Sequence, residues 1–203
     1  MSSSKQRIHQ LPYFEDSSVL FAPRSDQPWA VFLDSGFPNC RQGRFDLIAA
    51  DPVYKLITQG KQTKIIGSDQ EIQISDEDPF QLIKRFVHSD SVACNGLPFS
   101  GGAIGYFSYD LARRLENLPV IAQNAENIPE MMVGIYDWVV VVDHEQRKSH
   151  LLSQGLSKKT DENWPDLIRQ FSGLNDSWRE ASFVVTGCIR SNMTKEQYAK
   201  AFG

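Results

Sequence analysis

The feature that most constrains the fold is a series of short, strand-like runs in the first half of the chain. The runs are continuously apolar or alternate apolar with polar side chains, as buried and half-buried strands do. They cover residues 29–33, 45–50, 53–58 and 71–74. Gly60 and the Gly-Ser-Asp cluster at 67–69 are turn signals between them. The pattern predicts an antiparallel meander over about residues 28–75.

The second half adds strands to this meander. Residues 132–143 form one long apolar run that predicts a largely buried strand. Residues 147–153 follow across a short Asp-His-Glu-Gln turn and predict its hairpin partner. Residues 182–186 predict one further strand.

Helices are predicted where apolar residues recur at helical spacing after a capping residue. Asp78 and Pro79 begin a helix that presents Phe80, Ile83, Phe86 and Val87 on one face. A second helix covers about residues 161–171, with Gly173 as its stop, and its apolar stripe is Trp164, Leu167, Ile168 and Phe171. Residues 111–116 form a short helix. Thr194 and Gln197 fit a capping box, so a last helix begins shortly before Gly203.

Charge and cysteine content exclude several classes of protein. The 203-residue chain has 21 basic and 25 acidic residues and a net charge of −4, which argues against nucleic-acid binding. It contains no run of 18 apolar residues and no secretory h-region, so we expect a cytoplasmic protein without a membrane span. Cys40, Cys94 and Cys188 form no disulfide framework, and the four histidines lack metal-binding spacing. We expect no metal site.

Three segments are candidate sites. The glycine-rich residues 101–105 lack the GxGxxG and Walker patterns, and close backbone approach explains them better than phosphate binding. The charged cluster of Asp110, Arg113, Arg114 and Glu116 is read as a solvated helix face in preference to internal pairing or acid binding. From composition alone, the loop between residues 34 and 44 is better explained as an ordinary hairpin loop than as a small-ligand site that uses the Ser35 hydroxyl and backbone amides.

Five segments, taken in order, resemble the N-terminal part of aminodeoxychorismate synthase component I, a relative of anthranilate synthase component I among the chorismate-binding enzymes. They include Leu-Asp-Ser-Gly, Gly-Ile-Tyr-Asp-Trp and Ser-Asn-Met-Thr-Lys-Glu-Gln-Tyr. The segments are residues 33–36, 43–52, 98–111, 129–138 and 191–198. The resemblance implies an α+β fold in which antiparallel β-sheets pack as a sandwich with flanking helices. It also implies a flexible N-terminus at 1–10, an anthranilate synthase-like N-terminal domain at 11–190, and the first helix of a truncated catalytic domain at 191–203.

The resemblance further implies a reaction, a cofactor and a partner. Family members add ammonia to chorismate with Mg²⁺ and yield 4-amino-4-deoxychorismate, on the way to 4-aminobenzoate and folate. A glutamine amidotransferase subunit, component II, supplies the ammonia. The family's Pro-Ile-Lys-Gly-Thr motif and Mg²⁺-binding glutamates belong to the C-terminal half and do not occur here. We therefore assign no catalytic and no metal-binding residue, and expect this chain alone to lack synthase activity and to leave open sheet edges and exposed apolar faces.

Family members also hold tryptophan in this region, as an inhibitor or as a buried ligand. The matching positions are Ser35, Gln42, Gly43, Arg44 and Phe45. The serine hydroxyl would contact the ligand's ammonium or carboxylate, and Arg44 and Phe45 would wall the site. Two alternatives stay open at this stage: anthranilate synthase component I of tryptophan biosynthesis, and a non-catalytic amino-acid-binding module.

Overall fold

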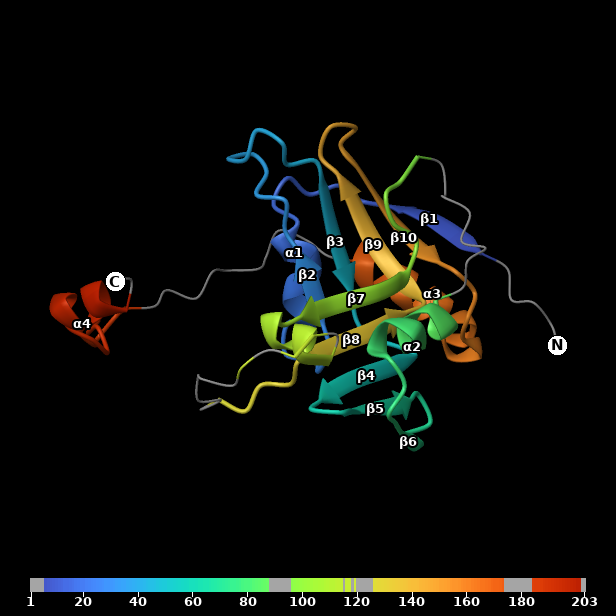
Figure 1. Cartoon of the computed structure of the whole chain (residues 1–203). Coiled ribbons are helices and arrows are strands. Elements are labelled where there is room, and N and C mark those ends of the chain that lie inside the picture. The colour runs from blue at the N-terminus through green and yellow to red at the C-terminus, as the bar shows by residue number, and fades with distance from the viewer. Residues whose placement is uncertain are drawn as a thin grey trace.

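The computed structural model describes residues 6–87, 96–114, 116, 117, 119, 126–173 and 184–201, which build two antiparallel sheets of five strands (Figure 1). The first sheet has the strand order β1-β10-β9-β3-β2, and the second has the order β6-β5-β4-β8-β7. The strands of the first sheet are β1 (Arg7–Leu11), β10 (Lys148–Ser153), β9 (Trp138–Asp143), β3 (Phe45–Ala49) and β2 (Val31–Leu33). Those of the second are β6 (Ile72–Ser75), β5 (Gln62–Gly67), β4 (Tyr54–Gln59), β8 (Met131–Tyr136) and β7 (Gly102–Phe107).

The two sheets are joined where β8 runs into β9 at Asp137. The sequence predicts one strand here, and the structure divides it into two. The buried Asp137 carboxylate accepts hydrogen bonds from the backbone N–H groups of Leu156 at 2.9 Å and Ser157 at 3.1 Å. These bonds hold the chain after β10 against the β8–β9 junction. The strands of the first sheet cross those of the second steeply (Figure 1).

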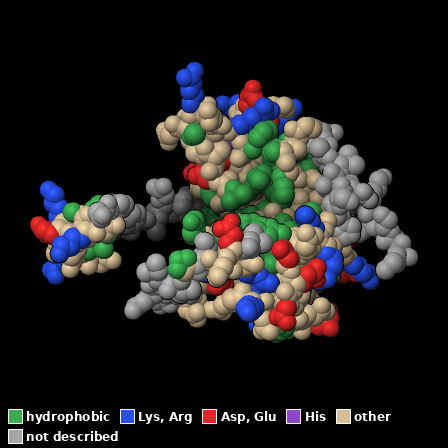
Figure 2. All heavy atoms as spheres, viewed as in Figure 1, with side chains coloured by type: hydrophobic (Ala, Val, Ile, Leu, Met, Phe, Trp, Pro, Cys, Tyr) green, Lys and Arg blue, Asp and Glu red, His purple; other side chains and the backbone are tan. Residues whose placement is uncertain are grey.

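Apolar side chains from both sheets form a shared core, so the predicted sandwich is confirmed. The first sheet contributes Val139, Val141 and Leu152, and the second contributes Ile104 and Tyr136. A second cluster lies on the other face of the first sheet and includes Leu20, Trp164 and Phe171. A third, around Leu56, Leu82 and Val133, packs the second sheet against a helix. Figure 2 shows hydrophobic side chains gathered on the visible face near the region where the sheets meet.

The structure has six helices among its described residues, and all but α4 flank the sheets, as predicted. They are α1 (Ser18–Phe21), the 3₁₀ helix η1 (Ala22–Arg24), α2 (Pro79–Phe86), the 3₁₀ helix η2 (Tyr109–Arg114), α3 (Lys158–Ser172) and α4 (Lys195–Lys200). Asp78 caps α2 by accepting from the N–H groups of Phe80 and Gln81, and Thr194 and Gln197 form the predicted capping box of α4. In α2 the fully buried residue is Leu82, whereas Phe80 is 38% exposed and stacks on Phe107. No helix of the described segments is long and apolar enough to cross a membrane.

Three expectations from the sequence need correction. Residues 7–10, expected to be flexible, belong to β1, because their backbone pairs with the edge of β10 from Arg7–Ser153 to Leu11–Ser149. The strand β5 was not predicted, because its sequence combines polar and apolar side chains without a clear strand pattern. Its pairing with β4 and β6 defines it. The strand expected at 182–186 is absent from its described part, residues 184–186, where Val184 and Val185 are highly exposed; residues 182 and 183 lie outside the described residues.

Gly105 explains the glycine-rich segment at 101–105. Gly105 pairs with Val133 in the β7–β8 ladder. A Cβ atom at this position would stand 2.0 Å from the Met132 carbonyl oxygen and 2.7 Å from Val133 Cα. Both obstacles are backbone atoms, so only glycine permits this approach. The steric interpretation is confirmed at this position.

Candidate functional site

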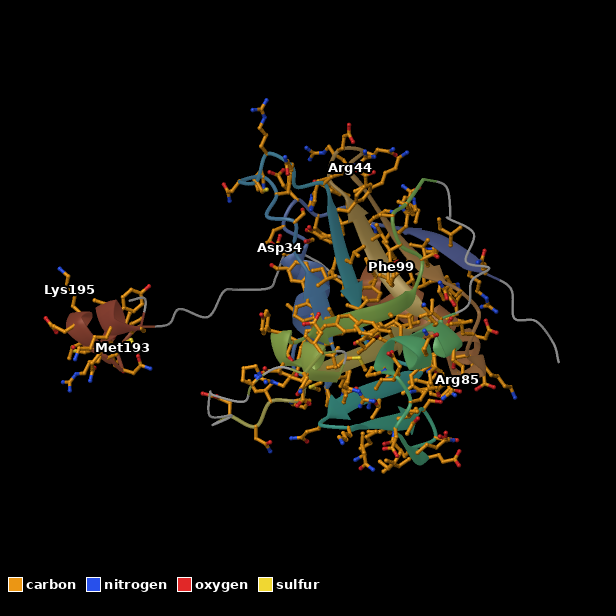
Figure 3. All side chains as sticks on the ribbon, in the orientation of Figure 1. Asp34, Arg44, Arg85, Phe99, Met193 and Lys195 are labelled. Carbon is orange, nitrogen blue, oxygen red and sulfur yellow. The ribbon has the colours of Figure 1, made fainter. Side chains whose placement is uncertain are left out.

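The candidate site is the loop at residues 34–44 that joins β2 to β3. Its two ends are held together by the antiparallel pairing of Leu33 with Leu47. Inside the loop, the Cys40 N–H donates to the Gly36 carbonyl at 2.6 Å, and the Gly43 N–H donates to the Cys40 carbonyl at 3.0 Å. Asp34 and Arg44, which flank the loop, are labelled in Figure 3.

The buried carboxylate of Asp46, at the start of β3, anchors this loop. Its Oδ1 accepts the Ser35 backbone N–H at 2.8 Å. Its Oδ2 lies 2.8 Å from His144 Nε2 and also accepts the Ser17 hydroxyl. Three segments that are distant in the sequence therefore meet on one side chain. Burial raises the pKa of Asp46, but the hydrogen bonds from His144, Ser17 and the Ser35 N–H outweigh burial and leave it below its ordinary value.

His144 carries the network onward to the N-terminal segment and to the loop. Its Nδ1 lies 3.1 Å from the Tyr13 hydroxyl, which fits the tautomer that has its proton on Nε2 and accepts at Nδ1. The Phe37 ring stacks on the imidazole with 4.3 Å between the centroids. The loop is thus held by a buried hydrogen-bond network on one side and by a ring stack on the other.

Ser35 has the chemistry of a ligand contact. Its backbone N–H is fixed by Asp46, while its hydroxyl oxygen is buried and forms no hydrogen bond of good geometry, although the hydroxyl lies close enough to Asp46 to help lower the pKa of that carboxylate. Buried hydroxyls are normally hydrogen-bonded, because an unsatisfied one costs about 1–3 kcal/mol. Ser35 therefore presents a fixed donor and acceptor that a polar ligand group would satisfy.

The other four predicted residues lie around the end of the same loop. Gly43 packs so tightly that a Cβ atom would stand 2.8 Å from the Ser35 carbonyl oxygen. Phe45 packs against the core between the sheets, and the Arg44 guanidinium lies over its ring, 4.5 Å from the centroid. Gln42 is exposed. The structure thus brings Ser35 and Gly43 into contact and Arg44 onto Phe45, and it leaves the Gln42 side chain at the surface.

Arg44 is already engaged by carboxylates. It bonds Asp143 through Nη2 at 3.0 Å and Nε at 3.3 Å, and its Nη1 lies 2.6 Å from Glu145. Burial raises the pKa of Asp143, but the Arg44 hydrogen bonds and charge bring it below its ordinary value. Arg44 consequently ties the loop to the end of β9. Its charge is balanced by the carboxylates of Asp143 and Glu145.

The charged cluster at residues 110–116 is partly solvent-exposed, as expected, and its arginines also pair within the protein. Arg113 Nε bonds Asp110 at 2.7 Å, and Arg114 donates to the carbonyls of Gly60, Asp76 and Glu77. Arg114 thereby ties η2 to the β4–β5 and β6–α2 turns. Glu116 is exposed, as expected.

A metal does not fit the described part of the chain. Within those segments, no group of three or more His, Cys, Asp or Glu side chains is arranged to hold an ion. Mg²⁺, which the resemblance implies for the whole enzyme, therefore has no site among the described residues. Of the three cysteines, Cys40 and Cys188 are exposed thiols, and Cys94 lies outside the described residues.

The sequence reasoning missed Asp46, His144, Ser17 and Tyr13. One signal was present: Asp46 interrupts the apolar run at 45–50, and a carboxylate in a buried strand requires partners. The identity of those partners was not readable, because His144 lies 98 residues away in a polar turn.

Comparison with known proteins gives consistent matches. Residues 33–203 match the family described as chorismate binding enzyme. The chain is 38% identical to aminodeoxychorismate synthase component 1 of Escherichia coli K12, over 100% of this chain and 44% of that protein. It is 28% identical to anthranilate synthase component 1 of Pseudomonas putida, over 94% of this chain and 42% of that protein.

A solved structure supports the fold. The crystal structure of anthranilate synthase component I from Streptococcus pneumoniae matches with a TM-score of 0.52 and 24% identity, over 65% of this chain and 32% of that one. In each of these comparisons the chain spans less than half the length of the protein it matches.

Proposed function

The chain belongs to the chorismate-binding enzyme family, and we propose that it forms the N-terminal part of an aminodeoxychorismate synthase component I. The observation that carries the proposal is the 38% identity to the Escherichia coli protein along the entire chain. A second relative of the same name, from Klebsiella aerogenes, is 37% identical over 95% of the chain. The anthranilate synthase of Pseudomonas putida, at 28%, supports the alternative less strongly.

In this proposal the complete enzyme adds ammonia to chorismate and forms 4-amino-4-deoxychorismate. An amidotransferase subunit, component II, delivers the ammonia, and residues outside this chain bind Mg²⁺ and perform the chemistry. The present chain contributes the sheet framework and the loop that begins at Ser35.

We further propose that the Ser35 loop is one wall of a tryptophan site. The proposal is supported by the buried, unsatisfied Ser35 hydroxyl and by the rigid anchoring of its backbone on Asp46. The hydroxyl would bond the ammonium or carboxylate of the amino acid, and the Phe45 side of the loop would contact the indole ring. Arg44, engaged by Asp143 and Glu145, would hold this wall in place. Because the Ser35 loop forms only one wall of the proposed site, we expect this chain to bind tryptophan with millimolar affinity.

Tryptophan binding tests the second proposal. Millimolar tryptophan should raise the thermal midpoint of the 203-residue chain, since a ligand of the folded state stabilises it by mass action. Ser35→Ala should lose most of this rise. Ser68→Ala, which removes an exposed serine from the turn after β5, should keep it. An unmoved midpoint in the unmodified chain would count against the site.

A chimera tests the first proposal. The aligned region of the Escherichia coli protein is replaced by this chain and expressed in a strain that lacks component 1. We expect growth without added 4-aminobenzoate. The 203-residue chain alone, and the remainder of the Escherichia coli protein alone, should give no growth. Growth with the chain alone would contradict the proposed division of labour.

A further inference from the structure

A second polar site surrounds Arg24, the last residue of η1. Only 8% of Arg24 is exposed. Its guanidinium carbon lies 5.1 Å from the Trp138 ring centroid and 5.2 Å from that of Phe171. Its Nη1 donates to Gln27 Oε1 at 3.1 Å, and its Nη2 donates to Gln170 Oε1. Arg24 is therefore buried against two neighbouring aromatic rings and bonded to neutral amides.

The charge of Arg24 has no carboxylate of its own. A buried cation is normally paired, because leaving a charge desolvated and unpaired is costly. No carboxylate of the described segments forms an ion pair with Arg24. Asp51 acts on it from a longer distance, but its Oδ2 bonds Lys159 Nζ at 3.1 Å. Burial lowers the pKa of Arg24, and Asp51 only partly opposes this effect.

Arg24 lines a cavity of about 270 Å³ that holds an excess of positive charge. Three cations border it, namely Arg24, Lys55 and Lys159, but only two carboxylates, Asp51 and Asp166. Both carboxylates are already paired, Asp51 with Lys159 and Asp166 with Arg169 at 2.7 Å. Asn163 and Thr160 add neutral polar groups to the lining. Since Lys159 is the partner of Asp51, the cations of the lining that have no carboxylate within ion-pair distance among the described residues are Arg24 and Lys55.

We propose that this cavity binds a small oxyanion, a carboxylate or a phosphate, with Arg24 at its floor and Lys159 at its mouth. Nη1 and Nη2 of Arg24 each carry a second N–H beyond the one that Gln27 or Gln170 accepts, and such N–H groups bind both kinds of oxyanion. The volume admits a molecule of several heavy atoms. Asp51 competes with the ligand for both cations. The site is separate from the Ser35 loop, because Asp46 and Asp51 lie at opposite ends of β3. It is also independent of the proposed synthase and tryptophan functions.

The test is a titration of the 203-residue chain with sodium malonate, sodium phosphate or sodium chloride at matched ionic strength. The thermal midpoint of unfolding is measured at each concentration. Malonate or phosphate should raise the midpoint saturably, and chloride should not. Saturation by malonate alone assigns a carboxylate ligand, by phosphate alone a phosphate ligand, and by both a general oxyanion site. The absence of saturation with both oxyanions would overturn the proposal.

Two substitutions of exposed residues should change the affinity for the oxyanion in opposite directions. Both leave the buried Arg24 in place. Asp51→Asn removes the competing carboxylate, and asparagine tolerates the left-handed backbone found there, with φ 58°. It should tighten binding about two- to fivefold, as expected for one partly exposed charge pair. Lys159→Gln should weaken binding by a similar factor.

The matched control is Arg85→Gln, which removes an equal charge from α2, outside the cavity lining. It should leave the apparent Kd unchanged. A purely structural role for Arg24, as a link between η1 and α3, predicts no anion saturation and no opposite shifts. If Asp51→Asn and Lys159→Gln changed the apparent Kd in the same direction, the proposed site would therefore be wrong.

Discussion

Asp46 connects three separate segments, and its environment shows how single residues prepare the Ser35 loop. Its oxygens receive the Ser35 N–H, the Ser17 hydroxyl and His144 Nε2 in a site that is 2% exposed. Each of these donors would be left unsatisfied without the carboxylate. The Ser35 backbone is consequently held at one position, which would lower the entropic cost of the proposed tryptophan binding.

The stability of the chain should depend on Asp46 and on pH. Asp46→Asn should lower the free energy of unfolding at pH 7 by about 3 kcal/mol, because it removes a buried charged acceptor. The pKa of Asp46 is lower in the folded chain than the ordinary value of about 3.9. Its contribution is therefore complete above that value and is lost as the pH falls through the folded pKa. Urea unfolding between pH 7 and pH 3 measures both effects.

The control for this prediction is Asp69→Asn, the same chemical change at an exposed turn between β5 and β6. It should change the unfolding free energy by less than about 0.5 kcal/mol. The acid-induced loss of stability should be smaller in Asp46→Asn than in the unmodified chain. An identical pH dependence in the two proteins would show that Asp46 is not a stabilising carboxylate.

Part of this site could be predicted from the sequence alone. The Leu-Asp-Ser-Gly motif predicted the loop and Ser35, and the strand patterns placed the loop between β2 and β3. The partners of Asp46 could not be predicted, since hydrogen bonds between residues 98 apart depend on the packing of both sheets. The hydrogen bonds between Arg44 and Asp143 could not be predicted for the same reason.

At the scale of elements, the pairing of β7 with β8 depends on one glycine. Gly105→Ala should destabilise the chain by about 3 kcal/mol, because the new methyl group meets the Met132 carbonyl and the strands must separate. Urea unfolding gives the magnitude, and hydrogen exchange should show lost protection in β7. Gly187→Ala is the control, since a Cβ atom there meets nothing within 4 Å. Equal stability of the two variants would contradict the close approach.

The elements with strong local signals were predicted well. The capped helices α2 and α4 and the β9–β10 hairpin follow their sequence patterns. Elements that depend on distant partners were not: β1 is a strand because it adds to the edge of β10. The division of residues 131–143 into two strands depends on Asp137 and its bonds to Leu156 and Ser157, which no local pattern records.

At the scale of the whole molecule, two crossed sheets share one core and present apolar side chains outward. Leu33 and Phe107 are 45% and 50% exposed, and Figure 2 shows hydrophobic side chains, in green, gathered in the central part of the visible face. In α4 every described residue is exposed, and Figure 3 labels Lys195 on this helix, which is drawn apart from the sheets. These surfaces agree with the proposal that the chain works as one part of a larger enzyme.

The most direct test of that proposal is the product made by the purified chimera. It is supplied with chorismate, Mg²⁺ and ¹⁵N-ammonium, and the product is identified by mass spectrometry. We predict one ¹⁵N atom in 4-amino-4-deoxychorismate, with the enolpyruvyl group retained. A soluble chimera that instead yields labelled anthranilate and pyruvate, or that leaves chorismate unchanged, would contradict the account.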